Sequence, residues 1–188
     1  MVAAFWAVYV VLHSVLASLT IKKFFKKKLG TYFKHYRLAY TIFAFAGFVL
    51  VVWFQASIRS ADIFKPFLFT NIAGVIVTAA GLTIMLICIK KYFMGLSGLR
   101  SLVQEENYSE LHISGIHRYV RHPLYLGTFL FIWGLFIVFP TLSLLISNSV
   151  ITIYTLIGIK LEEKKLVLEF KEQYKAYQKT VPKLIPKF

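Results

Sequence analysis

Two short stretches of this 188-residue chain gather side chains that could do chemistry. The first, residues 114–127, reads SGIHRYVRHPLYLG. Pro123 fits the first turn of a helix, where its missing N–H costs nothing, so Arg121 and His122 should lie at a helix N-terminus. Free backbone N–H groups at such an end favour an anion, for example the carboxylate of a ligand. Gly127, about one turn further on, would let another backbone or a flat ligand approach closely.

The second stretch, residues 160–165, contains the adjacent carboxylates Glu162 and Glu163. Apolar and aromatic residues then recur every three or four positions, which predicts an amphipathic helix that lies on a membrane surface or folds back over the protein. These residues are Val167, Phe170, Tyr174, Tyr177 and Val181. Each stretch alone also fits a simpler interpretation, namely an interfacial anchor for the first and ion pairs on a solvated helix face for the second.

The elements that must position these stretches follow from composition. Apolar residues make up 58% of the chain and charged residues 16%, yet the net charge is +14. Soluble domains carry about 25% charged residues. The composition therefore excludes a soluble nucleic-acid binder and a disordered chain, and the single cysteine, Cys88, excludes a disulfide scaffold. We expect an integral membrane protein that forms one domain over residues 1–188.

A helix needs about 20 apolar residues to cross a bilayer. The uncharged runs predict an all-α protein with five spans, at about residues 2–21, 38–58, 66–89, 123–139 and 141–160. The last two come from one uncharged run that is too long for one helix and suits a helical hairpin. Its turn fits either Pro140 or the polar cluster at residues 147–149, and we prefer Pro140-Thr141 because the fifth helix then stays long enough to cross.

The cations give this arrangement a direction. Segments 22–37 and 90–121 and the tail from residue 160 hold twenty of the 22 Lys and Arg residues, and segment 57–66 holds the other two. With five spans and the N-terminus outside, those twenty cations face the cytoplasm, as the positive-inside rule requires. We expect an integral protein of the bacterial inner membrane or its equivalent, with the polar loops and the C-terminus on the cytoplasmic side.

The hairpin would bring the two polar stretches to the same membrane face. Acidic and basic groups would then form a cytoplasmic pocket, in which a charged cofactor could meet a substrate dissolved in the membrane. Two other polar features have simpler interpretations, which we favour. The lysine-rich run at residues 22–28 is a topology anchor rather than a specific site for anionic lipid. His13, which lies within a span, makes an interhelical packing contact rather than a functional site.

The polar stretches also resemble a known family. The RHPLYLG run at residues 121–127, the hairpin, the paired glutamates and the spacing of the tail resemble the isoprenylcysteine carboxyl methyltransferase and phospholipid methyltransferase superfamily. The tail residues that carry the resemblance are Phe170, Tyr174, Tyr177, Val181, Pro182, Ile185 and Pro186. Near the N-terminus, residues 13–18 and 36–40 resemble the NnrU-like and methanethiol S-methyltransferase branches. This resemblance implies an integral membrane enzyme that uses S-adenosylmethionine, with its catalytic half at about residues 100–188.

The resemblance also implies the site residues. Catalytic roles would fall to Arg121, His122 and Glu162. Cofactor contacts would come from a connector that begins at Gln104, from the start of the fourth span and from the paired glutamates; the residues are Gln104, Glu110, Leu111, His112, His117, His122, Pro123, Leu124, Tyr125, Glu162 and Glu163. Three positions differ from the family's usual pattern. His117 replaces a tyrosine, Lys171 replaces a glycine, and only Lys160 stands near the place of an arginine that is tied to carboxylate acceptors.

Methyl transfer from a sulfonium needs alignment and exclusion of water rather than a metal. A thiol or amine acceptor would need a base, which His122 or His117 could supply, whereas a carboxylate acceptor would need none. The partners implied are the bilayer and either a membrane lipid or a small hydrophobic substrate, with no nucleic acid. The alternative functions are a small membrane transporter or accessory protein and a family member that binds cofactor or lipid without turnover.

Overall fold

The computed structural model describes residues 1–96, 111 and 113–186, and within them it confirms an all-helical protein without strands. Asp62 and Thr141 form an isolated β-bridge. The chain divides into two compact units, the first with residues 1–61 and the described part of 92–107, the second with residues 62–91 and the described part of 108–188. The helices are α1 (Val2–Ala17), α2 (Leu19–Leu29), η1 (Gly30–His35), α3 (Tyr36–Ser57), α4 (Leu68–Leu96), η2 (Gly115–Arg118), α6 (Pro123–Val138) and α7 (Leu142–Thr180).

Several of these helices suit a membrane. Three helical stretches are long and apolar enough to cross a bilayer, namely Thr20–Ser57, Leu68–Lys91 and Leu142–Thr180. Two shorter apolar helices, α1 and α6, accompany them. Large apolar side chains are exposed along α1, α3 and α4, as expected for helix faces that contact lipid rather than water. The helices thus support an integral membrane protein, while the number of crossings stays a prediction.

Two helices have bounds that differ from the predicted spans, and the spans themselves stay predictions. The first span was expected over residues 2–21, but α1 ends at Ala17 because the Ser18 hydroxyl accepts the Ile21 N–H at 3.3 Å and starts a new helix, α2. The fifth span was expected to end near residue 160. Instead α7 continues through the paired glutamates, because the charged sequence beyond the apolar part keeps good helix formers, and it ends at Thr180.

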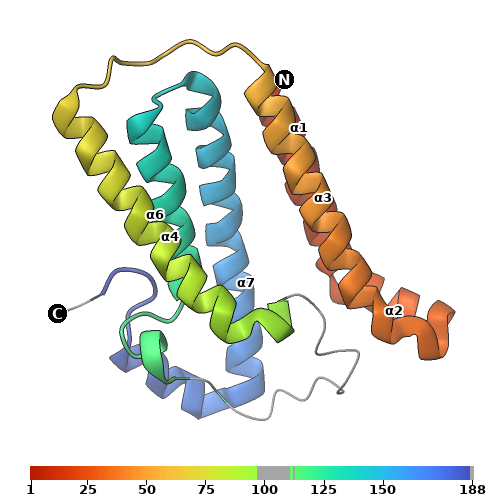
Figure 1. Ribbon diagram of the computed structural model, residues 1–188. Coiled ribbons are helices and arrows are strands. Elements are labelled where there is room, and N and C mark those ends of the chain that lie inside the picture. The colour runs from red at the N-terminus through yellow and green to blue at the C-terminus, as the bar shows by residue number, and fades with distance from the viewer. Residues whose placement is uncertain (97–110, 112, 187–188) are drawn as a thin grey trace. The chain divides into compact units, whose positions relative to one another are not determined.

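In the first unit, α1 and α3 lie side by side (Figure 1). Polar side chains join them along their length: Trp6 Nε1 donates to Gln55 Oε1 at 2.7 Å, and the Tyr40 hydroxyl lies 2.8 Å from His13 Nε2. This contact is the interhelical hydrogen bond predicted for His13. Hydrogen bonds of this kind hold helices together in a medium where apolar faces gain little from contact with each other.

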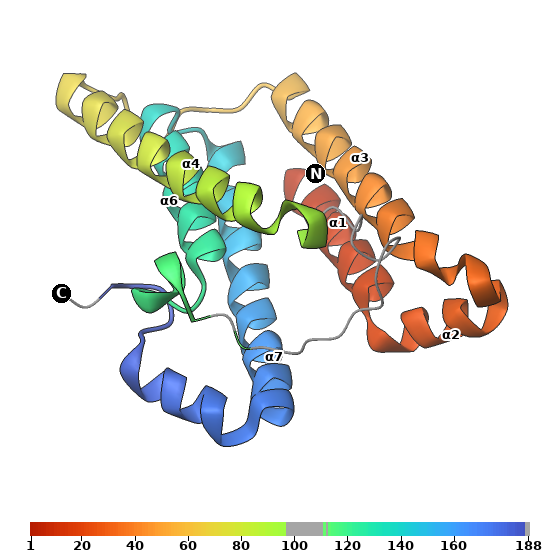
Figure 2. The ribbon, with the colours of Figure 1, turned by 60° about the horizontal axis from the view of Figure 1, so that its bottom comes forward.

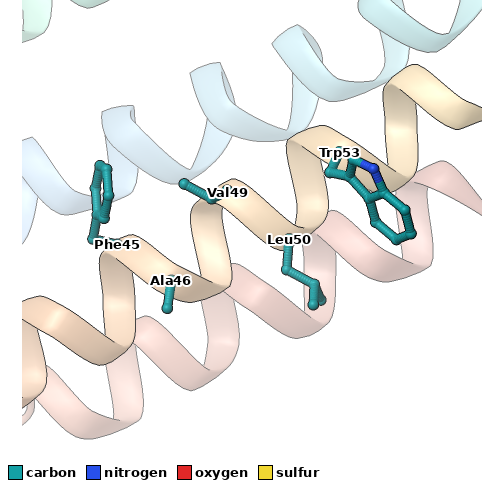
Figure 3. Close-up of a pocket in the computed structure, with 5 residues that line it drawn as sticks. All are labelled: Phe45, Ala46, Val49, Leu50 and Trp53. Carbon is teal, nitrogen blue, oxygen red and sulfur yellow. The ribbon is translucent and has the colours of Figure 1, made fainter.

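The outer face of α3 carries a shallow apolar groove of about 460 Å³. Figure 3 shows its lining, which comes from Phe45, Ala46, Val49, Leu50 and Trp53 on one side of the helix. These side chains offer hydrocarbon and aromatic surface and no titratable group, so the groove is unsuited to acid–base chemistry. The two polar stretches singled out from the sequence lie in the second unit.

In the second unit, α4, α6 and α7 lie side by side (Figures 1 and 2). Glycines let α4 and α6 approach until their backbones touch. A Cβ atom built on Gly81 would lie 2.7 Å from the Gly127 carbonyl oxygen, and one built on Gly134 would lie 3.0 Å from the Gly74 carbonyl oxygen. The close approach expected at Gly127 is therefore made by the backbone of α4. Such pairs of small residues are typical of helix packing in membranes.

The hairpin of α6 and α7 turns at Pro140-Thr141, as preferred from the sequence. The Thr141 hydroxyl caps α7 by accepting the Leu144 N–H at 3.3 Å. The alternative turn at residues 147–149 is wrong, because this cluster lies inside α7. Asn148 there donates its side-chain amide to the Ile132 carbonyl of α6 at 2.7 Å, which fastens the two helices together.

Near its end α7 is broken at Lys171, whose backbone angles are φ 47° and ψ −123°. Beyond this residue the helix changes direction (Figure 2). The turn buries the aromatic face of the terminal part, with Tyr174 1% exposed and Tyr177 8% exposed. Of the two arrangements predicted for this amphipathic segment, folding back over the protein is therefore the correct one.

We expect Gly81→Ala to destabilise the protein by about 2 kcal/mol, because the added methyl group cannot fit against the α6 backbone. Gly158→Ala in α7 is the matched control, since its added methyl meets no atom within 4 Å and alanine is the better helix former. Thermal unfolding in detergent should give a lower midpoint for the first variant and an equal or higher one for the second. Equal midpoints for Gly81→Ala and the wild type would contradict the packing described.

We expect Lys171→Gly to stabilise the protein by about 1 kcal/mol, because only glycine adopts a positive φ without strain. The same change at Lys165, an exposed position with regular helical backbone, should cost about 1 kcal/mol. Thermal unfolding should therefore show a higher midpoint for Lys171→Gly and a lower one for Lys165→Gly, which tests whether the helix is broken at Lys171. Destabilisation by both substitutions would show that Lys171 is an ordinary helical residue.

Candidate functional site

The predicted polar stretches meet in the second unit, where the chain enters α6. Backbone hydrogen bonds pair this entry with the C-terminal segment: the Arg121 N–H donates to the Pro182 carbonyl at 2.9 Å, and the His122 N–H donates to the Lys183 carbonyl at 3.1 Å. Pro123 then begins α6 at its first position, as predicted. The end of the chain is thus fixed against the start of α6.

Glu163, on α7, lies at the centre of this junction and is 8% exposed. Its Oε1 accepts from Arg121 Nε at 2.9 Å and Nη2 at 2.8 Å, and lies 3.2 Å from His122 Nε2. Its Oε2 lies 3.1 Å from Lys183 Nζ. One buried carboxylate therefore joins three separate segments of the chain.

The surroundings of Glu163 set its charge. Burial by itself would raise the pKa of the Glu163 carboxyl, but the hydrogen bonds from Arg121, Lys183 and His122 outweigh that effect and lower the pKa below its ordinary value of 4.5. The carboxylate is thus ionised at neutral pH and compensates the cations that it contacts.

Arg121 uses its other donors within the protein. Its Nη1 donates to the carbonyl oxygens of Gln178, at 3.1 Å, and Val181. These carbonyls belong to the last turn of α7 and the residue after it, so the guanidinium ties the end of that helix to Glu163. Arg121 thus lies in the predicted cluster, and its guanidinium N–H groups donate to protein oxygens.

Glu162 differs from its neighbour, because its side chain is 46% exposed. Its Oε2 lies 3.7 Å from Nδ1 of His122, whose side chain is 5% exposed. The His122 ring stacks on Tyr125 with 5.7 Å between the ring centroids and 29° between their planes, and Tyr125 also interacts with Glu162. Glu162 is thus the carboxylate that a bound molecule can reach.

The remaining predicted residues lie around this cluster or outside the described chain. His117 directs Nδ1 at the Arg121 carbonyl at 3.1 Å, and the His117 carbonyl accepts the Tyr177 hydroxyl at 2.6 Å. Leu111 is partly buried, as is Leu124 in the first turn of α6. Gln104, Glu110 and His112 lie outside the described residues.

Sequence reasoning missed two residues of the cluster. Lys183 was counted only as one cation of a basic tail, although its place directly after Pro182, where the amphipathic helix ends, was a usable signal. Tyr174 was recognised as part of an aromatic face, but the pattern could not show that its ring is buried beside Glu163.

The described cluster suits an organic cofactor with charged ends. The first-turn N–H groups of Leu124 and Tyr125 have no helical carbonyl to pair with and suit a carboxylate. Glu162 offers an exposed carboxylate for an amino or hydroxyl group. Among the described residues no three His, Cys, Asp or Glu side chains are grouped to hold a metal ion.

We expect Glu163→Gln to destabilise the protein by about 3 kcal/mol at neutral pH, because the neutral amide leaves the buried Arg121 without its counter-ion. The lowered pKa means that Glu163 stabilises the fold above about pH 4.5 and loses this effect as the pH falls through the folded-state value. The difference in unfolding midpoint between variant and wild type should therefore narrow in acid. Glu162→Gln is the control and should change the unfolding midpoint little at any pH. A difference in midpoint between Glu163→Gln and wild type that stays the same at every pH would contradict this prediction.

Known proteins with similar sequences identify the family. The family model "Phospholipid methyltransferase" matches residues 68–173, which include the glycine contacts, the hairpin and the paired glutamates. The methanethiol S-methyltransferase of Crocosphaera subtropica is 34% identical over 190 residues, which cover 95% of this chain and 71% of that protein. The corresponding enzyme of Pseudomonas deceptionensis is 41% identical over 73 residues, or 38% of this chain and 26% of its own. No solved structure shows significant similarity. The chain belongs to the phospholipid methyltransferase family, within the superfamily that the sequence motifs resemble, and it is a membrane methyltransferase.

Proposed function

We propose that this methyltransferase moves a methyl group from S-adenosylmethionine to a small thiol, at a pocket formed by the start of α6, the paired glutamates of α7 and the C-terminal segment. The observation that carries the proposal is the pair of His122 and Glu163, with Nε2 of the imidazole 3.2 Å from the buried carboxylate. A thiol acceptor needs a base, and this pair supplies an oriented one. The relatives' names, methanethiol S-methyltransferase, support the same class of acceptor.

The residues named from the sequence take the following roles in this proposal. The first-turn N–H groups of α6, from Leu124 and Tyr125, bind the carboxylate of the methyl donor. Glu162 pairs with the amino group or ribose hydroxyls of the donor. When bound, S-adenosylmethionine supplies an electrophilic methyl group on a sulfonium. The connector residues Gln104, Glu110, Leu111 and His112 and the nearby His117 complete the donor site.

His122 acts as the base. A carboxylate only accepts hydrogen bonds, so the contact with Glu163 keeps a proton on Nε2, and Nδ1, which lies 3.7 Å from Glu162 Oε2, is the nitrogen left to accept one. In this role Nδ1 would take the thiol proton as the thiol sulfur accepts the methyl group that a bound donor would supply, with the donor's carbon–sulfur bond as the bond broken. Arg121 holds Glu163 in place through two contacts below 3.0 Å. The products would be a thioether from the acceptor and a neutral sulfide from the donor.

The acceptor is a thiol rather than a carboxylate for a reason in the sequence. The arginine that the superfamily places shortly before the paired glutamates is tied to carboxylate acceptors, and here only Lys160 stands nearby. A carboxylate would also make the oriented imidazole unnecessary. A lipid amine is the second candidate, favoured by the family model, whose description is phospholipid methyltransferase.

We propose that the single domain of residues 1–188 crosses the bilayer five times, with its N-terminus outside. The five apolar helices and the placement of twenty of 22 cations on one side support this topology. It puts the pocket and the C-terminus on the cytoplasmic side of the bacterial inner membrane or its equivalent, where a water-soluble donor can meet an acceptor dissolved in lipid.

Purified protein in detergent should transfer labelled methyl groups from S-adenosylmethionine to methanethiol, and much more slowly to phosphatidylethanolamine. His122→Ala should lower kcat/KM for the thiol by about 100-fold or more, as expected for loss of a general base. Glu162→Gln should raise KM for the donor by about tenfold, equivalent to about 1.4 kcal/mol.

The controls are His35→Ala and Glu169→Gln, which change the same residue types at exposed positions and should leave both constants unchanged. If the enzyme methylates the lipid amine in preference to the thiol, the acceptor is the second candidate, a lipid amine. If His122→Ala methylates the thiol at the wild-type rate, His122 is not the base.

A further inference from the structure

One buried hydroxyl beside the cluster has no hydrogen-bond partner. Tyr174 lies on the part of α7 that folds back after Lys171, and it is 1% exposed. Its hydroxyl and the side-chain oxygen of Asn71, near the start of α4, are the two side-chain polar atoms in the described parts of the chain that are buried and unpartnered. Folded proteins pair nearly all such groups, so each exception needs an explanation.

The surroundings of Tyr174 give that explanation. Its ring packs at 5.8 Å, centroid to centroid, on that of Tyr177, and it interacts electrostatically with Glu163, Arg121 and Glu162. Burial and the nearby Glu163 charge raise the pKa of Tyr174 above its ordinary value, so the group is a neutral hydroxyl that can donate. Arg121, His122 and Glu163 all have partners within the cluster. The Tyr174 hydroxyl is the group that the cluster leaves unsatisfied.

We propose that the Tyr174 hydroxyl is a binding group for the methyl donor and hydrogen-bonds to an oxygen or nitrogen of the bound molecule. This inference rests on the proposed function, because it takes the cluster to be the donor site. The hydroxyl has almost no exposed surface. A bound donor therefore reaches it only after a side chain that covers it has moved.

Tyr177 provides a matched control on the same helix face. It is also a buried tyrosine, but its hydroxyl donates to the His117 carbonyl at 2.6 Å and so has a structural partner. Removal of each hydroxyl should therefore have opposite consequences. Loss of the Tyr177 hydroxyl breaks a hydrogen bond of the free protein, whereas loss of the Tyr174 hydroxyl removes an unpaired polar group from it.

The test compares Tyr174→Phe, Tyr177→Phe and wild type in detergent, by thermal unfolding without ligand and by isothermal titration with S-adenosylmethionine. We expect Tyr174→Phe to unfold at the wild-type temperature or above and to bind S-adenosylmethionine about three- to tenfold more weakly, the loss of one hydrogen bond. Tyr177→Phe should unfold at a lower temperature and, assayed where it is folded, bind with a smaller change in Kd.

Wild-type affinity in Tyr174→Phe would overturn the inference while leaving the proposed donor intact. A lower unfolding temperature of Tyr174→Phe with unchanged affinity would overturn it too, since the hydroxyl would then have a structural partner such as a bound water. Absence of S-adenosylmethionine binding by well-folded wild-type protein would instead overturn the proposed function, and the inference with it.

Discussion

The buried carboxylate of Glu163 is the constraint on which the described site depends. An ion removed from water must be compensated by charges and hydrogen bonds, or its burial costs several kcal/mol. Here the compensation comes from Arg121 and His122 before α6 and from Lys183 after α7. Because these residues are far apart in sequence, the need to satisfy one carboxylate fixes the C-terminal segment against the start of α6.

The helices place that carboxylate through contacts made elsewhere. Glycines allow α6 to lie directly against α4, and Asn148 fastens α7 to α6 within the hairpin. The register of α7 along α6 therefore follows from packing in the apolar region. That register decides which residue of α7 reaches His122. Helix-packing contacts in the apolar region therefore determine the geometry of the polar cluster.

Features governed by local rules could be predicted from the sequence. The apolar runs gave the helices, Pro123 gave the start of α6, and the turn at Pro140 followed from the length that α7 needs. Features that depend on tertiary contacts could not. The end of α1 was decided by a cap at Ser18, the direction of the terminal helix by an unfavourable backbone conformation at Lys171, and the role of Lys183 by a partner twenty residues away. The sequence pattern identified the residues of the polar cluster but could not say which charges were already paired.

The paired glutamates show why that distinction matters. Successive residues of a helix point about 100° apart, so two adjacent carboxylates differ in their surroundings even where, as here, both lie near the His122 ring. In α7 this geometry turns Glu163 toward Arg121, His122 and Lys183 and leaves Glu162 at 46% exposure. One carboxylate thus stabilises the junction and orients the imidazole, while its neighbour remains open to a bound molecule. Two identical neighbouring residues can differ in burial and in partners in this way because the helix, rather than the residue type, decides what each of them contacts.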